Sequence, residues 1–147
     1  MADNYFKNEV AVITPQDMEK AFEGEFRQYI QGNLANPQKL KYIWSDECEI
    51  GISYYEEYTH DDPHYHDIIT ETNYIISGKV ILRILDTNEE YLVEAGGVFS
   101  VPPKIKHVLK IAPKTKIIFT KSECVNDKHP VPFEDLGLDE WFEESDF

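Results

Sequence analysis

The spacing of hydrophobic and polar residues changes near residue 41 of the chain. Before that point, Thr14-Pro15-Gln16-Asp17 offers an N-cap hydroxyl, a proline at the first helical position and an acid at the third, which predicts a short helix. After it, short runs rich in Ile, Val, Tyr and Phe are bounded by Gly, Pro, Asp or Asn, a pattern typical of strands and turns. Strands are predicted at residues 41–44, 49–57, 71–76, 79–85, 90–93, 98–101, 107–111 and 116–121.

Eight short strands without helices between them indicate an all-β fold, an antiparallel sandwich or barrel. The sequence contains no internal repeat and no low-complexity linker, so we expect one domain over residues 1–147. Its expected parts are an N-terminal extension (1–40), a β-barrel core (41–121) and an acidic C-terminal tail (122–147).

The tail combines acidic residues with a small apolar face. Leu138, Trp141 and Phe142 have the spacing of one face of a helix, so a short amphipathic helix should dock on the barrel or on a second subunit. Binding of the acidic tail to a basic partner is the alternative.

The composition excludes several classes of protein. A hydrophobic share of 41%, with 13% aromatic residues, excludes a disordered chain. The 28 acidic and 14 basic side chains give a net charge of −14, which disfavours binding to nucleic acids and anionic membrane surfaces. No apolar run is long enough to span a membrane, and the first residues lack the features of a secretory signal. We therefore expect a cytoplasmic protein with Cys48 and Cys124 as reduced thiols rather than a structural bridge.

Candidate chemistry lies in two segments that contain histidine. His64 and His66 are two apart on an extended segment, so both imidazoles point to the same face and can bind one metal ion. Glu71 follows at an odd offset, so residues 67–70 must bend and Glu71 must begin a neighbouring strand. His107 begins a later strand and adds a third imidazole. Each histidine alone is more often an ordinary surface or core residue, but the full N₃O set suits Zn, Ni, Mn or ferrous iron.

The turn at Gly78 predicts which side chains share the inner face. A two-residue hairpin would pair Ile75 with Val80, and alternation along the strands then places Glu71 and Asn73 on that apolar face. A carboxylate in such a place costs several kcal/mol unless a cation or a donor meets it. Glu71 is therefore a candidate metal ligand, and Asn73 a candidate polar contact to a bound small molecule.

The spacing of His64, His66, Glu71 and Gly78 resembles the first motif of the cupin superfamily. That motif runs His-x-His, Glu and Gly, and this chain has gaps of four residues before Glu71 and six after it. Tyr58 stands where the motif has a further glycine.

Gly96, Pro102 and His107 resemble the second cupin motif, and the two motifs together cover about residues 58–121. Lys104 occupies the place of a turn glycine, and Ile111 that of an asparagine. We expect the turn at Lys104 to form without a positive φ angle, which a lysine disfavours. None of the departures changes a ligand position.

The resemblance implies a jelly roll that holds one divalent transition metal ion per chain, and a homodimer. It also implies a small-molecule metalloenzyme, either a dioxygenase or an isomerase or epimerase of sugars or sugar phosphates. The alternative is a non-catalytic, metal-containing module that binds or senses a small ligand.

A catalytic acid or base should be a further titratable side chain near the metal. His60, and Tyr54 or Tyr55, are candidates by position, although a surface location is the simpler interpretation of His60. The small-molecule ligand could be anionic, attracted by lysines in a stretch that lacks acids, and solvated lysines on the outer face are the alternative. These lysines are Lys104, Lys106, Lys110, Lys114, Lys116 and Lys121.

Overall fold

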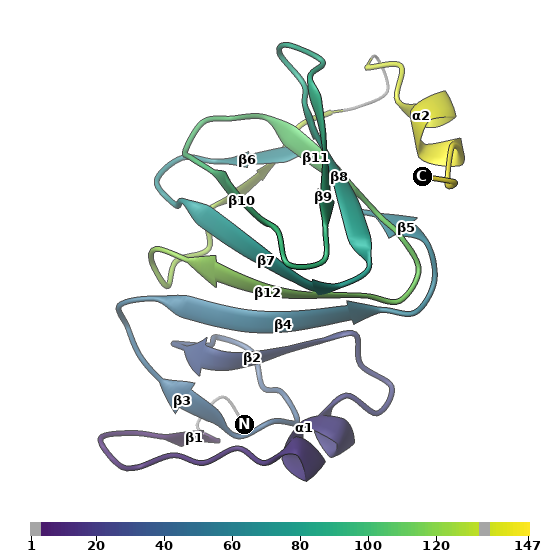
Figure 1. Ribbon diagram of the computed structural model, residues 1–147. Coiled ribbons are helices and arrows are strands. Elements are labelled where there is room, and N and C mark those ends of the chain that lie inside the picture. Colours follow the sequence, from purple (N-terminus) through teal and green to yellow (C-terminus); the bar gives the residue numbers. More distant parts are fainter. Residues whose placement is uncertain (1–3, 133–135) are drawn as a thin grey trace.

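The computed structural model describes residues 4–132 and 136–147, whose framework is two β-sheets (Figure 1). The first sheet contains, in spatial order, β1 (Tyr5–Phe6), β3 (Tyr42–Trp44), β2 (Arg27–Gly32), β4 (Glu49–Tyr55), β12 (Thr115–Lys121), β7 (Glu71–Ser77) and β10 (Val98–Val101). The second contains, in order, β13 (Lys128–Pro130), β6 (His64–His66), β11 (His107–Ile111), β8 (Lys79–Ile84) and β9 (Glu90–Glu94), with β5 (Thr59–His60) also paired to β11. The pairings are antiparallel except those of β3 with β1 and with β2.

All eight predicted strands are confirmed, with ends that differ by at most two residues. The segment at residues 64–66, expected to be extended, is strand β6. Four short strands, β1, β2, β5 and β13, were not predicted. In β2 the residues Arg27 to Gly32 hold few apolar side chains, so the alternation that marks a half-buried strand is weak there.

The hairpin predicted at Gly78 is wrong. β7 pairs with β10 and β12, whereas β8 pairs with β9 and β11, so the chain crosses from one sheet to the other at this turn. Gly78 has φ 75°, and a Cβ there would lie 2.6 Å from the Cα of Thr115. The predicted faces are nevertheless correct: Ile75 and Val80 are buried and Tyr74 is exposed, because alternation along one strand does not depend on its pairing partner.

Apolar side chains from both sheets form the core between them. These residues are Ile75, Val80, Leu82, Phe99, Val101, Leu109, Ile111 and Ile117. On β11, His107 lies on the same side as Leu109 and Ile111, so this histidine sits at one end of the apolar core.

Short helices are confirmed near both ends of the chain. Helix α1 (Pro15–Ala21) begins with the predicted capping box, in which Thr14 Oγ1 accepts from the Asp17 amide at 3.1 Å. Helix α2 (Asp139–Glu143) lies against the second sheet, where Trp141 and its neighbours pack on Val108 (Figure 1). The expected docking of the tail on its own barrel is therefore confirmed. Within the described residues, neither helix is long and apolar enough to cross a membrane.

Candidate metal centre

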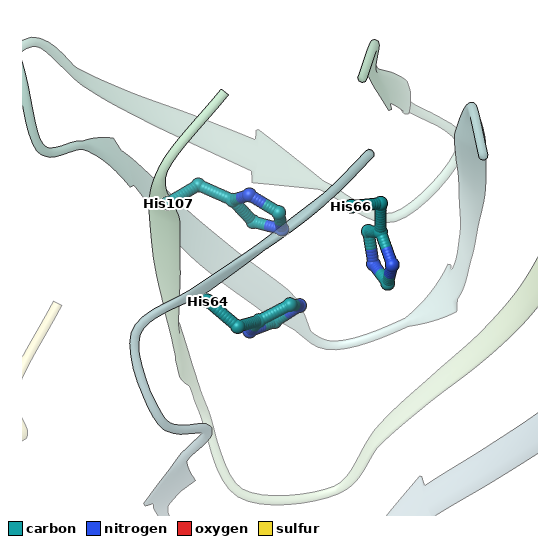
Figure 2. Close-up of side chains that lie close together, drawn as sticks. All are labelled: His64, His66 and His107. Atoms are coloured by element: carbon teal, nitrogen blue, oxygen red, sulfur yellow. The ribbon is translucent and has the colours of Figure 1, made fainter. Parts of the chain in front are cut away.

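Strands β6 and β11 bring three histidines to one point. His64 and His66 lie two apart on β6, and His107 is directly opposite His64 in the antiparallel pairing with β11. The ring nitrogens that could act as ligands all lie within 4.8 Å of one another. Figure 2 shows the rings pointing toward one another, and the residues are 6%, 3% and 3% exposed. The structure thus brings together the three imidazoles that the sequence selected.

Main-chain carbonyl groups fix the orientation and tautomer of each ring. The Nδ1 atom lies 2.7 Å from the Asp62 oxygen in His64, 3.1 Å from the Asp127 oxygen in His66 and 2.8 Å from the Ile105 oxygen in His107. Because a carbonyl oxygen only accepts, each Nδ1 carries the hydrogen. The Nε2 lone pairs are then left to act as ligands, the arrangement found in metal-binding histidines.

Glu71 lies at the edge of this triad. Its Oε2 is 3.2 Å from His66 Nε2, but its oxygens do not fall within 4.8 Å of all three imidazoles. Burial alone would raise the pKa of the Glu71 carboxyl, but the interaction with His66 and the charge of Lys121 lower it to about 2. With His66 Nδ1 protonated, the facing nitrogen and carboxylate are both acceptors, so their approach requires a proton or a metal cation between them. The donor set fits a divalent transition metal.

Burial also keeps two of the histidines in the neutral form. It lowers the pKa of His64 to about 4, although the hydrogen bond to Asp62 opposes the shift. It lowers the pKa of His107 as well. The neutral imidazole is the form that binds metal, so at physiological pH no proton need be displaced from either ring.

His60 does not lie with the triad. His60 pairs with Lys110 of β11, and the Lys110 side chain points outward beneath α2. The His60 ring stacks on Phe142, with the ring centroids 3.7 Å apart. The offset of four residues from His64 suggested proximity, but the chain leaves β5 before it forms β6. His60 is therefore placed on the outer face of the barrel, at the docking site of the tail.

The other predicted polar residues occupy three different positions. Tyr55 packs against the core, and its hydroxyl accepts a hydrogen bond from Arg27 at 3.1 Å. Tyr54 points away and donates to Glu56 at 2.7 Å. Asn73 is buried on the inner face, and its Nδ2 lies 3.4 Å from Glu71 Oε1, so it contacts the candidate ligand.

The turn at Lys104 differs from expectation. Lys104 has φ 71°, so it adopts the left-handed conformation that a glycine would adopt more readily. Its amide donates to the carbonyl oxygen of His66. This hydrogen bond ties the turn to β6.

A cavity of about 850 Å³ opens beside His66. Arg27, Tyr29 and Lys121 are among its lining residues, and of the six lysines singled out in the sequence it contains Lys121 alone. Arg27 and Tyr29 were missed because their segment was not recognised as a strand. Apolar and polar residues alternate only weakly along that segment, so its pattern gives little indication of a strand.

A second group of side chains lies on the surface behind β6. His129 Nε2 is 3.2 Å from an Asp67 oxygen and 3.1 Å from Asp127 Oδ1. The other Asp127 oxygen accepts from the amides of Ile68 and Ile69. These residues are hydrogen-bond and ion-pair partners of one another. The group therefore has a structural explanation, because its contacts stabilise the bend after β6.

Comparisons with known proteins find similarity at the level of the fold. No family model and no curated protein matches the chain. The chain is similar to Streptomyces Pac13, described as a unique nucleoside dehydratase, with 16% identity and TM-score 0.55 over 70% of this chain and 78% of that one. It is also similar to KdgF from Halomonas sp., with 15% identity and TM-score 0.53 over 68% and 79%.

An oxalate oxidase in complex with the substrate analogue glycolate has 20% identity and TM-score 0.51 over 64% of this chain. The chain spans about half of that enzyme, 51% of its length. These neighbours are cupin-fold proteins, and the present chain has the cupin fold. The jelly roll implied by the sequence motifs is therefore confirmed.

Proposed function

We propose that this protein is a metal-dependent cupin-type protein that acts on a small molecule. One divalent transition metal ion per chain, Zn, Fe, Mn or Ni, would be held by His64, His66, His107 and Glu71. The observation that carries this proposal is the convergence of three buried imidazoles whose Nδ1 atoms all lie within hydrogen-bonding distance of carbonyl oxygens. The Nε2 atoms are then acceptors in a buried site. Burying such acceptors costs free energy unless a cation binds them.

The reaction classes proposed are those of a dioxygenase or of an isomerase or epimerase of sugars or sugar phosphates. When bound, the metal ion supplies Lewis acidity toward a ligand oxygen. The chain itself orients the ligand set: Asn73 holds one oxygen of Glu71 and leaves the other facing His66. Pac13 and the oxalate oxidase, whose structures were determined with uridine and with glycolate, support a small-molecule ligand.

A non-catalytic module that contains metal and binds or senses a small ligand is the second candidate. One observation favours it: His60, offered as an acid or base, is stacked on the tail outside the barrel. In that case a ligand would bind in the cavity beside His66 and leave unchanged.

Elemental analysis of protein purified without added metal tests metal binding, which both candidate functions require. We expect close to one transition metal ion per chain, and at least about tenfold weaker metal binding in His64→Ala, Glu71→Gln and His107→Ala. His60→Ala is the matched control, because it also removes an imidazole but from the outer face. Full occupancy in the ligand variants would show that the ligands are wrongly assigned.

The identity of the metal separates the reaction classes. Iron accompanied by ligand-dependent oxygen uptake supports a dioxygenase. Zn, Ni or Mn without oxygen uptake supports an isomerase or epimerase if a sugar is converted, and the binding module if the ligand is recovered unchanged.

We also propose that the protein is a homodimer. The outer face of the first sheet exposes Tyr74, Ile76 and Val98, which are 44%, 40% and 58% exposed. Val98 and Tyr74 are directly opposite each other on β10 and β7, so the three side chains form a continuous apolar patch. Light scattering on the purified chain should give twice its mass, and Tyr74→Glu should reduce that value to one chain.

A further inference from the structure

An arginine in the cavity has no acidic partner. Arg27 Nε donates to Ser53 Oγ at 2.8 Å, and Nη2 donates to the Tyr55 hydroxyl at 3.1 Å. Among the residues that the structure describes, no carboxylate oxygen lies within 4.0 Å of its guanidinium nitrogens. Both acceptors are neutral, so they orient the guanidinium without neutralising it.

Cations outnumber carboxylates by one among the side chains that line the cavity, although the protein as a whole is strongly acidic. Its charged side chains, apart from His66, are the cations Arg27, Lys39, Lys121 and Lys128 and the carboxylates Glu25, Glu49 and Asp127. Lys39 pairs with Glu25 at 3.8 Å, and Lys121 pairs with Glu49 at 3.2 Å. Four cations against three carboxylates give a local excess of positive charge in a chain whose net charge is −14.

The buried ring of Phe119 packs beside Arg27, and Tyr29 contributes an aromatic side chain to the cavity lining. The guanidinium carbon of Arg27 lies 4.9 Å from the Phe119 ring centroid, and Lys121 Nζ lies 5.8 Å from the same point. Tyr29 meets this ring edge to face. Since Arg27, Tyr29 and His66 all line the same cavity, one small molecule resting beside Tyr29 has the guanidinium and this histidine within a common space.

We propose that Arg27 is an anion-binding residue, and that the ligand of this cavity carries a carboxylate or a phosphate group. A guanidinium binds either group through two parallel hydrogen bonds, and Ser53 and Tyr55 hold it ready to do so. Binding of an anion offsets the cost of a partly buried charge whose hydrogen-bond partners, Ser53 and Tyr55, are both neutral. This inference rests on the proposed function to the extent that the same ligand reaches the metal centre.

Calorimetric titration of the purified protein with malonate, inorganic phosphate and malonamide tests the proposal. Malonate or phosphate should bind, and neutral malonamide should not. Arg27→Met should weaken binding of the anion at least about tenfold, because a hydrogen bond to a charged group is lost. Arg27→Lys should restore part of it, and Lys106→Gln, which removes an exposed cation elsewhere, should change affinity less than about twofold.

Binding of malonate alone identifies a carboxylate ligand, and binding of phosphate alone identifies a phosphate ligand. A second measurement uses the unaltered protein: the Arg27 Nε–H resonance, assigned by its absence in Arg27→Lys, should shift with the anion but not with malonamide. Equal affinity in Arg27→Met, or no shift of that resonance, would overturn the proposal. Metal content separates the two hypotheses, since Arg27→Met should retain its metal. A chain that binds metal but not anions would disprove only the role of Arg27.

Discussion

The main-chain carbonyl of Asp127 accepts a hydrogen bond from Nδ1 of His66 at 3.1 Å, although the two residues stand 61 positions apart. The carboxylate of Asp127 accepts from the amides of Ile68 at 2.7 Å and Ile69 at 3.1 Å. One residue therefore fixes the tautomer of a candidate ligand and fastens the bend that leads to Glu71. Both functions depend on β13, which pairs with β6.

Asp127→Ala should weaken metal binding roughly tenfold, because the bend after β6 loses its acceptor and His66 loses its fixed position. The measurement is metal affinity by competition with a chelator of known strength. Asp62→Ala is the matched control: the Asp62 carbonyl also accepts from a histidine, but its side chain is exposed. Equal losses of affinity in both variants would contradict the assigned role of the Asp127 carboxylate.

The part of the site that the sequence predicted is the part determined by local geometry. A spacing of two on a strand is enough to place His64 and His66 on one face, whatever the strand pairs with. The inward position of Asn73 followed from the same alternation, even though the hairpin assumed for β7 and β8 does not exist.

Arg27 and Asp127 could not be predicted, because their roles depend on contacts between distant segments. Arg27 reaches the cavity through the pairing of β2 with β4, and Asp127 through the pairing of β13 with β6. Neither residue belongs to a recognisable motif. The two short strands that carry or adjoin them have weak apolar alternation, so the pattern gave no reason to place them near the histidines.

Lys110 anchors the C-terminal helix, and its replacement should loosen the tail. Its Nζ donates to the carbonyl oxygens of Trp141 at 2.9 Å and Glu144 at 2.8 Å. Lys110→Met should lower the free energy of unfolding by about 1–3 kcal/mol, since these charged hydrogen bonds are lost. Trp141 fluorescence should shift to longer wavelength, while metal content stays constant.

The control for this variant is Lys116→Met, because Lys116 is exposed on the first sheet, away from the tail. An unchanged Trp141 emission spectrum in Lys110→Met would mean that apolar packing alone holds the helix. The test therefore separates the charged contacts from the packing on Val108.

Gly51 allows the Phe119 ring to lie flat on the sheet. A Cβ at position 51 would be 2.2 Å from Cζ of Phe119, whose side chain is buried and cannot swing away freely. Gly51→Ala should therefore destabilise the protein by about 1–3 kcal/mol through overcrowding. Urea unfolding of Gly51→Ala, Phe119→Leu and the double variant provides the check. The double variant should be more stable than the sum of the single losses, and strict additivity would exclude the clash.

The buried carboxyl group of Asp61 should make the stability of the fold depend on pH. Its Oδ1 accepts from the Leu109 amide at 2.7 Å and its own amide donates to the Leu109 carbonyl, so it continues the β-ladder between β5 and β6. Burial raises the pKa of the Asp61 carboxyl to about 7. The Leu109 amide and Lys128 oppose this shift, whereas Glu71 and Asp62 add to it.

Because the folded state binds the Asp61 proton more tightly than the unfolded state, stability should fall as pH rises from about 4 to about 7. Asp61→Asn keeps the acceptor for the Leu109 amide but removes the ionisation. This variant should be more stable than the unaltered protein at pH 8, and the difference should shrink toward pH 5. Unfolding midpoints measured across this range provide the test. If the unfolding midpoints of Asp61→Asn and of the unaltered protein change in parallel with pH, Asp61 ionises without cost in the folded protein. The pH dependence of stability then originates elsewhere.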